Sequence, residues 1–337
     1  MRLRTMTFID HAIEYLSRVV KETLQPPRHC GDMRSFTEKS VLRTSDLNAD
    51  GEGKRLRLVQ ISDLHYAPGG EADRGLVDAA RLIHRLEPDL IIVSGDLTRN
   101  GLFEHFLPVH AFLRSLGIER VRAIPGNRDY LGGGPGPMAP SDSDFDYFLV
   151  APDTPDVNAT HGSMELTTPF TQFFDDIDFF ERQKEIAIIG LDSEPVIPDE
   201  SLKRGLAFLE ASSSKATRVF CTHRSLLPIP RKKLKPGDLL PNAGDVLAAL
   251  LAARVDLVLC AHLHRVHAWQ LSDGQHSMVV VNAPSLLDTS PGKENGLLVI
   301  DIQRRGELCV TLHGLTNGTE SVLFDTRESR KLQKSGK

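Results

Sequence analysis

The stretch Val59-Gln60-Ile61-Ser62-Asp63-Leu64-His65-Tyr66 decides the fold of this chain. Its apolar start, preceded by Leu56 and Leu58, is typical of a buried β-strand. The strand ends in Asp63-Leu64-His65, so a carboxylate and an imidazole leave the strand end on the same side of the chain. Because open α/β sheets place their sites at strand ends, the stretch predicts a strand with a candidate site behind it.

Strands and helices alternate after this stretch. The apolar spacing predicts helix 73–86, strand 90–93, helix 102–116 and strand 121–124, then strands 186–191, 217–221 and 257–260 with helices 201–211 and 244–254 between them. This order implies parallel pairing with right-handed crossovers. After His264, four strands without helices are predicted at 266–271, 277–282, 296–302 and 307–313. We therefore expect an α/β fold with a second, mainly antiparallel sheet packed on the first.

The chain divides into one domain and its flanking segments. We expect an amphipathic helix at 1–27, a polar linker at 28–54, one domain at 55–325 with an insertion over the site at about 130–168, and a polar tail at 326–337. The polar half of the N-terminal helix carries charges of both signs, which favours docking on protein, although docking on a membrane stays open. A loop of this length is typical of a functional or a disordered segment, and we interpret it as an insertion over the site.

The composition excludes several classes of protein. The 337 residues carry a net charge of −5, so no basic field draws the chain to nucleic acid. We expect no transmembrane helix and no signal peptide, because the sequence lacks the apolar runs that both require. The cysteines Cys30, Cys221, Cys260 and Cys309 form no Cys-x-x-Cys motif. We therefore expect reduced, buried thiols and a cytoplasmic protein.

Polar side chains follow five of the predicted strands. They are Asp63 and His65, then Asp96, Asn127 and His223, and finally His262 and His264. Turn formation explains a single Asp or Asn at a strand end, and a lone histidine is more often structural than a ligand. Carboxylates, an amide oxygen and imidazoles at five strand ends in succession instead indicate a metal site.

These residues lie in motifs that occur together in one family. In chain order the motifs are Asp63-Leu64-His65, Gly95-Asp96, Gly126-Asn127-Arg128-Asp129, His223 and Ala261-His262-Leu263-His264. From about residue 56 to about 302 the sequence resembles the calcineurin-like metallophosphoesterases. The residues around the motifs, such as Gly95-Asp96-Leu97-Thr98 and Ile189-Gly190-Leu191-Asp192-Ser193, resemble the cyclic-nucleotide phosphodiesterase-like branch. The resemblance implies a two-sheet β-sandwich flanked by helices.

The resemblance also implies a centre of two divalent metal ions. One ion would be held by Asp63, His65, Asp96 and His264, and the other by Asp96, Asn127, His223 and His262. Two ions about 4 Å apart clamp a phosphoryl group and supply a bridging hydroxide for in-line attack at neutral pH. Oxygen and nitrogen ligands without a thiolate suit Mn, Fe or Zn, and our first expectation is Mn²⁺.

Three arginines depart from the family pattern. Arg128 replaces the usual histidine after Gly-Asn, Arg224 stands where a second histidine is common, and Arg99 stands where the family often has Asp. Arginine cannot donate a proton at neutral pH, but its forked guanidinium binds phosphate oxygens. We expect Asp96, Asn127 and Arg128 to be catalytic. We expect Arg128, Arg99 and Arg224 to bind substrate, with solvated surface positions as the alternative for Arg99 and Arg224.

The expected function is hydrolysis of a phosphodiester or diphosphate bond. Gly126-Asn127-Arg128-Asp129 is the form found in the UDP-2,3-diacylglucosamine diphosphatase branch, so a UDP-lipid-like nucleotide diphosphate and a cyclic nucleotide are both candidate substrates. The alternatives are a non-catalytic scaffold of the same fold and a protein phosphatase. The basic run Arg231-Lys232-Lys233-Leu234-Lys235 is typical of a solvated loop, with attraction of an anionic substrate or membrane surface as its alternative. We expect a small-molecule substrate and no nucleic acid partner; the sequence predicts no oligomeric state.

Overall fold

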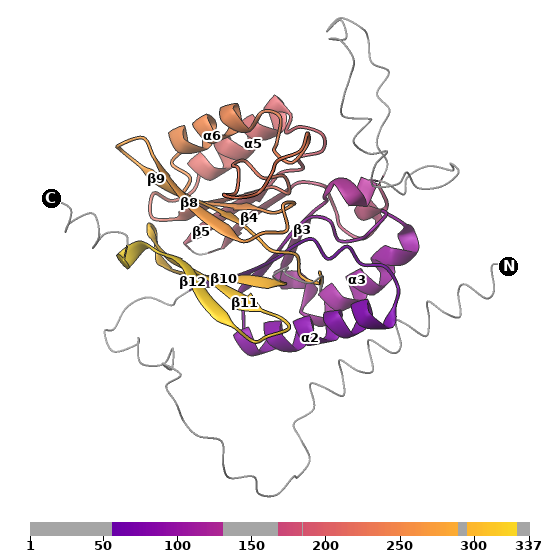
Figure 1. The fold of residues 1–337 in the computed structure, drawn as a ribbon. Coiled ribbons are helices and arrows are strands. Elements are labelled where there is room, and N and C mark those ends of the chain that lie inside the picture. The colour runs from indigo at the N-terminus through magenta and orange to yellow at the C-terminus, as the bar shows by residue number, and fades with distance from the viewer. Residues whose placement is uncertain (1–55, 131–167, 184, 289–294, 329–337) are drawn as a thin grey trace, which may run out of the picture.

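Two β-sheets and the helices that flank them make up the part of the chain that the computed structural model describes (Figure 1). The described residues are 56–130, 168–183, 185–288 and 295–328. The predictions for the helix at 1–27, the linker at 28–54, Cys30, the insertion beyond its two end residues and most of the tail at 326–337 lie outside these residues.

The elements alternate along the chain much as the apolar periodicity predicts. The helices are α2 (Gly70–Leu86), α3 (Phe103–Ser115), α5 (Asp199–Glu210) and α6 (Ala243–Ala252), with the short 3-10 helices η2 (Ile118–Arg120), η3 (Asn127–Tyr130) and η4 (Pro169–Gln172). The strands are β1 (Leu56–Ile61), β2 (Leu90–Ser94), β3 (Val121–Ile124), β4 (Phe179–Gln183), β5 (Ile186–Gly190), β6 (Thr217–Cys221), β7 (Leu257–Cys260), β8 (His267–Ser272), β9 (Ser277–Asn282), β10 (Gly296–Arg304), β11 (Glu307–Gly314) and β12 (Glu320–Asp325). Within the described ranges, no helix combines the length and the apolar character needed to cross a membrane.

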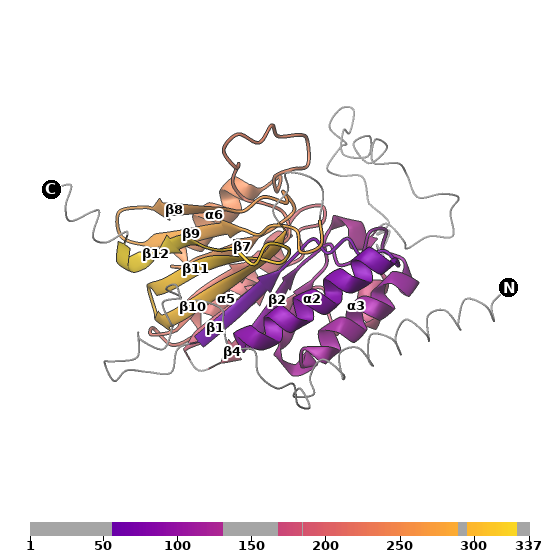
Figure 2. The same ribbon diagram turned by 60° about the horizontal axis from the view of Figure 1, so that its bottom comes forward.

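Sheet one has the strand order β12-β11-β10-β1-β2-β3. β1 pairs in parallel with β2, and β2 with β3, while β10 lies antiparallel to β1. α2 connects β1 to β2 and α3 connects β2 to β3, which are the crossovers that parallel strands require. Figure 2 shows α2 and α3 side by side on one face of this sheet. The carboxyl ends of β1, β2 and β3 therefore share one edge.

Sheet two has the strand order β4-β5-β6-β7-β9-β8. β5, β6, β7 and β9 are parallel, and β4 and β8 are antiparallel strands at the two edges. α5 lies between β5 and β6 in the sequence, and α6 lies between β6 and β7. The carboxyl ends of β6 and β7 therefore share an edge in the same way.

The prediction of a separate antiparallel sheet after His264 is wrong. β8 and β9 join sheet two, where β9 pairs in parallel with β7, whereas β10 and β11 extend sheet one. The chain thus passes from one sheet to the other between β9 and β10, and both sheets are mixed. The first five residues of β10 are buried, as in a central strand. The periodicity also missed β4 and β12, which are edge strands with few buried residues.

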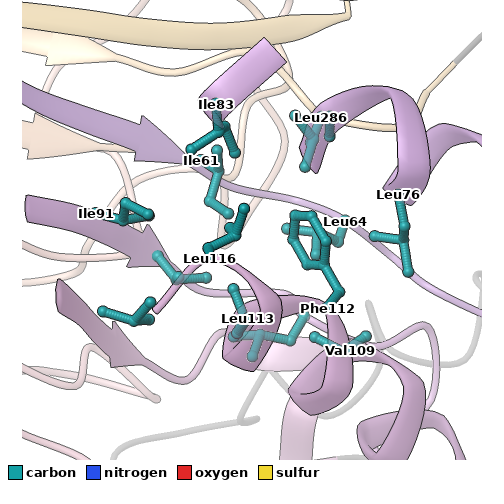
Figure 3. Close-up of a cluster of buried hydrophobic side chains, with 14 of the residues drawn as sticks. Ile61, Leu64, Leu76, Ile83, Ile91, Val109, Phe112, Leu113, Leu116 and Leu286 are labelled. Carbon is teal, nitrogen blue, oxygen red and sulfur yellow. The ribbon is translucent and has the colours of Figure 1, made fainter. Parts of the chain in front are cut away.

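Three apolar layers hold the architecture together. One lies between the sheets, one between sheet one and helices α2 and α3, and one between sheet two and helices α5 and α6. Figure 3 shows the second layer, a cluster of buried side chains that includes Ile61 and Ile91 of sheet one, Leu76 of α2 and Phe112 of α3. Burying a side chain of this size contributes about 1.5–3 kcal/mol. These layers fix the positions of the strand ends, and so of the site.

Three of the cysteines lie in described strands. Cys221 of β6 and Cys260 of β7 are free and buried, which confirms the prediction for these two residues. Burial raises the pKa of the Cys260 thiol to about 12. Cys309 is likewise not in a disulfide, but it is only half-buried on β11, so the prediction of a buried thiol is wrong there.

Candidate metal centre

The seven predicted ligand residues meet where the two sheets come together. Each follows the carboxyl end of a parallel strand, namely β1, β2 or β3 in sheet one and β6 or β7 in sheet two. Hydrogen bonds join the two sheet edges here. Gln60 Nε2 donates to the Cys260 carbonyl oxygen at 3.0 Å. The backbone N–H of His262 donates to Asp63 Oδ2 at 3.2 Å. Segments far apart in the sequence thus bring their polar ends to one place.

We call Asp63, His65 and His264 the open cluster. Asp63 Oδ1 lies 3.1 Å from His264 Nε2 and 3.7 Å from His65 Nε2. The two imidazole Nε2 atoms are 2.9 Å apart. One donor atom from each residue falls within 4.8 Å of the others, so the three can hold one metal ion together.

We call Asp96, His223 and His262 the buried cluster, because Asp96 and His223 are buried; His262 is half-buried. His223 Nε2 lies 3.4 Å from Asp96 Oδ1 and 3.3 Å from His262 Nδ1. Asn127 Oδ1 is 3.2 Å from the same His223 nitrogen, so the amide joins this group. The donor atoms of the three cluster residues again lie within 4.8 Å of one another.

Asp96 connects the two clusters. Its Oδ1 faces His223 of the buried cluster, and its Oδ2 lies 3.5 Å from Nε2 of His65 in the open cluster. The backbone N–H of Arg128 donates to Oδ1 at 2.8 Å and fixes the carboxylate in this orientation. This is the position that a bridging carboxylate requires.

The two clusters differ in their access to solvent. The side chains of His65 and His264 are 23% and 25% exposed, whereas the side chain of His223 is 0% exposed. Asp63 and Asp96 are both buried. The open cluster therefore forms the accessible side of the site.

Five of the seven predicted ligand residues have a left-handed backbone conformation. The φ angle is 49° at Asp63, 43° at His65, 52° at Asp96, 69° at His262 and 50° at His264. A non-glycine residue in this region is strained by about 1–2 kcal/mol. Strain of this kind clusters at functional sites, where the surrounding fold enforces it.

Two glycines let the backbone approach these side chains. Gly95 has a φ of +92°, and a Cβ there would lie 2.5 Å from Nδ1 of His223. A Cβ at Gly126 would overlap Oδ1 of Asp96. Both positions exclude a larger residue, which explains why a glycine precedes each of the ligand residues Asp96 and Asn127.

The electrostatics of the site favour bound positive charge. Burial would raise the pKa of Asp63 and of Asp96, but His264 opposite the first and His223 opposite the second hold both well below the ordinary value. Burial would lower the pKa of His223, but Asp96 raises it to about 10. Burial and the charge of His223 lower the pKa of His262 to about 3. The two carboxylates thus remain ionised and attract cationic partners.

Divalent metal ions fit this donor set. Asp63 Oδ1 is buried and lacks a hydrogen-bond donor among the described residues. Without a metal ion, a protonated His223 supplies the positive charge opposite Asp96. A bound cation would supply this charge instead, and it would require a neutral imidazole as its ligand. Carboxylate, amide oxygen and imidazole are ligands of first-row divalent metals. The two groups of ligand residues therefore fit two divalent metal ions.

A second set of contacts holds the ligand residues in place. His223 Nδ1 lies 2.8 Å from the Ser94 carbonyl oxygen, so it carries the proton and leaves Nε2 free to bind a metal.

The buried Asp129 carboxylate accepts hydrogen bonds from the backbone N–H groups of Leu97, Thr98 and Gly126. Asp129 therefore joins the loop after β2 to the loop after β3. The sequence motif contained Asp129, but the sequence analysis assigned it no role.

Tyr130 and Asp192 join η3 to sheet two. The Tyr130 hydroxyl donates to Asp192 Oδ2 at 2.7 Å. Burial raises the pKa of Asp192 to about 7, and the nearby charge of Glu194 adds to the shift. Asp192 lies in a motif that the sequence analysis quoted, but only the fold shows that it meets Tyr130.

The three predicted arginines fall in two different environments. Arg128 is half-buried and Arg99 is exposed, and both line a cavity beside the open cluster. Arg224 is buried, with Nη2 at 2.7 Å from Glu194 Oε2, and its Nη1 donates to the carbonyl of Gly237. Its charge is therefore matched by Glu194 inside the fold. We no longer assign Arg224 to substrate binding.

The cavity beside the open cluster has a volume of about 930 Å³. His65 and His264 line it together with Arg128 and Arg99, whereas its described lining residues include none from the buried cluster. Arg74 of α2, which the sequence analysis did not single out, lines it as well. Nothing in the sequence distinguishes Arg74 from other arginines, because arginine is common on the exposed surface of helices.

Known proteins share this fold. Residues 56–266 match the profile of the calcineurin-like phosphoesterases. Curated protein sequences give no match. A solved purple acid phosphatase from yellow lupin seeds is 12% identical to this chain, with a TM-score of 0.54. The alignment covers 81% of this chain and 53% of the phosphatase, so this chain spans about half the length of that protein. GAP50, the anchor in the inner membrane complex of Plasmodium, is 12% identical with a TM-score of 0.50, over 80% of this chain and 89% of that one.

Proposed function

Because the chain belongs to the calcineurin-like phosphoesterase family, we propose that it is a phosphohydrolase that depends on two divalent metal ions and cleaves a phosphodiester or diphosphate bond. The observation that carries the proposal is the pair of clusters with Asp96 between them. A single structural ion would need only one cluster. Two clusters that share a carboxylate are the arrangement that phosphoryl-transfer sites use.

The residues divide between two ions. Asp63, His65, His264 and Asp96 would hold one, and Asp96, Asn127, His223 and His262 the other. When bound, such ions polarise a phosphoryl oxygen and generate a nucleophile from water at neutral pH. Mn²⁺ is our first choice of metal, with Fe and Zn as alternatives, because all three accept this ligand set.

Arg128 would bind the phosphoryl group rather than move a proton. It lines the cavity beside the open cluster, close enough to His65 that its charge opposes protonation of that imidazole. A guanidinium cannot act as an acid at neutral pH, but it can bind two phosphate oxygens at once. The site would therefore favour substrates whose leaving group needs no proton. A diphosphate, such as a nucleotide diphosphate bearing a lipid, meets this condition better than a cyclic nucleotide.

The cysteines and the net charge support a cellular location and a class of substrate. We propose a cytoplasmic location, because Cys221 and Cys260 are buried free thiols. A small-molecule substrate is favoured over nucleic acid by the net charge of −5.

A panel of substrates tests the proposal. Purified protein loaded with Mn²⁺ would be given cyclic AMP, bis(4-nitrophenyl) phosphate, a UDP-sugar, a UDP-lipid and a phosphopeptide, with EDTA and the Asp96→Ala variant as controls. We expect hydrolysis of a diphosphate or diester that both controls abolish. Hydrolysis of the phosphopeptide alone would support the protein phosphatase. Two bound ions without hydrolysis of any compound would support the non-catalytic scaffold instead.

A further inference from the structure

We propose that Arg74 and Arg99 form a second anion subsite in the cavity, which holds the leaving phosphate group of a diphosphate substrate. The inference rests on the proposed function, and it adds the substrate class and the direction in which the substrate lies. We call this part of the cavity the distal subsite. The reacting phosphoryl group would lie at the open cluster and Arg128, and the leaving phosphate at Arg74 and Arg99.

One cavity is lined both by the open cluster and by the start of α2. His65 and His264 line it, as do Gly70, Glu71 and Arg74 of α2 and Arg99, which lies between β2 and α3. A substituent on a phosphoryl group bound at the open cluster would therefore share this cavity with Arg74 and Arg99.

Two guanidinium groups of the distal subsite are available to an anion. Arg74 and Arg99 are exposed and line the cavity, and no ion pair joins either of them to a carboxylate within the described ranges. Among the acidic lining residues, Asp78 pairs with Arg81 at 2.9 Å, and Asp288 lies on the side of the open cluster, 3.9 Å from His264 Nδ1. Guanidinium groups without a carboxylate partner are suited to binding phosphate oxygens.

The position of the Arg74 side chain supports this use. A Cβ on Gly70 would lie 3.5 Å from Arg74 Nη1, so the guanidinium folds back over the first turn of α2. The charge of Arg74 is therefore held at the end of the cavity that Gly69 and Gly70 line.

The rest of the cavity suits an organic group. Leu64, Leu287 and Leu315 line it alongside the polar residues. A volume of about 930 Å³ is at the large end of the range for sites that enclose small organic ligands. A diphosphate with an organic substituent would fill it, whereas a single phosphate ester would leave the distal subsite empty.

The bond change balances without a further reactant. Water adds its oxygen to one phosphorus and releases a proton to solvent, the bond from that phosphorus to the bridging oxygen breaks, and the bridging oxygen leaves with its electron pair on the second phosphate. The leaving phosphate is a weak base, so no side chain must protonate it. Arg74 and Arg99 would stabilise its added negative charge directly.

The first experiment measures binding and does not depend on turnover. Mn²⁺-loaded protein is titrated by calorimetry with imidodiphosphate, which has two phosphoryl groups and resists hydrolysis, and with orthophosphate. The wild type is compared with the Arg74→Ala/Arg99→Ala double variant and with Arg85→Ala, an exposed arginine at the other end of α2 that does not line the cavity. We expect the double variant to lose about 10- to 100-fold in affinity for imidodiphosphate and less than about twofold for orthophosphate. Arg85→Ala should change neither.

The second experiment measures hydrolysis of a UDP-sugar and of bis(4-nitrophenyl) phosphate. In the double variant, kcat/KM for the UDP-sugar should fall by at least about tenfold more than kcat/KM for the aryl diester, which has no second phosphate for the distal subsite. Equal losses for both substrates, or unchanged imidodiphosphate affinity, would overturn the distal subsite while leaving the hydrolase intact. If no substrate is hydrolysed, the proposed function fails, and the calorimetry still decides whether two phosphoryl groups bind.

Discussion

The open cluster and the buried cluster present similar ligands in different surroundings. Each has one carboxylate and two imidazoles, and each has donor atoms within 4.8 Å of one another. In the open cluster both histidines are about a quarter exposed and face a cavity. In the buried cluster His223 has no exposed surface and is held by Asn127 and the Ser94 carbonyl. We infer that the buried cluster anchors its ion, while the open cluster presents its ion to the substrate.

The largest effect should come from removing the residue that the clusters share. Asp96→Ala should abolish both ion sites, because one carboxylate faces His65 on one side and His223 on the other. We expect a loss of activity on the order of 10⁴-fold or more. Bound metal per chain, measured by plasma emission spectroscopy, should fall for both ions. Asp245→Ala, which removes an exposed carboxylate from the first turn of α6, is the matched control. A variant that keeps two ions would show that Asp96 bridges nothing.

A smaller and more specific effect should separate the two clusters. His264→Ala and His223→Ala should each leave one ion per chain, but in different surroundings. We expect EDTA to remove the ion of His223→Ala at least about tenfold faster than the ion of His264→Ala, because the remaining site in the first variant is open to solvent. Metal release followed with a chromogenic chelator gives both rates. Equal rates would remove the distinction between anchoring and presenting clusters.

Replacing Arg128 tests substrate binding at the open cluster without affecting metal binding. Arg128→Ala should reduce turnover of a diphosphate by about 10²- to 10³-fold, because one charged donor to the phosphoryl group is lost. Metal content should stay at the wild-type level, since the contact to Asp96 uses the backbone N–H of residue 128, which alanine retains. Steady-state kinetics and metal analysis on the same preparation check both parts.

The histidine variant gives the sharper form of this test. Arg128→His restores a group that can transfer a proton, so it should lose diphosphate activity and gain activity on diesters with poor leaving groups. The comparison uses a UDP-sugar against an alkyl phosphodiester. Unchanged rates on both would identify Arg128 as a bystander, and the preference for diphosphates would lose its main support.

The smallest effect concerns stability on the buried side. The pKa of the Asp192 carboxyl is raised from 3.8 to about 7 by burial and by Glu194, although the hydrogen bond from Tyr130 opposes the shift. Stability from this group is therefore fully present below about pH 4 and is lost as the pH rises through about 7. Asp192→Asn cannot ionise, so its gain over the wild type should grow by on the order of 2 kcal/mol between about pH 5 and pH 8.5. Urea unfolding at both pH values measures the gain. Asp245→Asn, at an exposed position, should show no such change, and a constant difference for Asp192→Asn would contradict the raised pKa.

The sequence predicted which polar residues follow the strand ends better than it predicted the sheets. The ligands are short motifs directly after apolar strands, so local pattern was enough to find Asp63, Asn127 and the histidines. Sheet membership depends on pairing between distant segments, and nothing local distinguishes β10, which lies beside β1, from β9, which lies beside β7. Strand order is therefore where the periodicity failed.

The arginines show the same limit at the level of side chains. Arg224 looked like a substrate ligand because it follows His223, but its partner Glu194 lies 30 residues earlier in the sequence. Arg74 looked like an ordinary surface residue because the cavity it lines is completed by segments after β9 and β11. Charge alone does not reveal a role for arginine; the fold supplies the partner or the cavity.

The left-handed backbone at five ligand positions has an evolutionary consequence. Glycine adopts such angles without strain, so replacing Asp63, His65, Asp96, His262 or His264 by glycine would relieve about 1 kcal/mol at each position. The same replacement would remove a ligand. A lineage without selection for the ligands could therefore accept glycine at these positions, whereas a lineage that keeps the ligands bears the backbone strain together with what they bind. Glycine at these five positions in a related chain would thus mark the point at which the fold was kept and its chemistry abandoned.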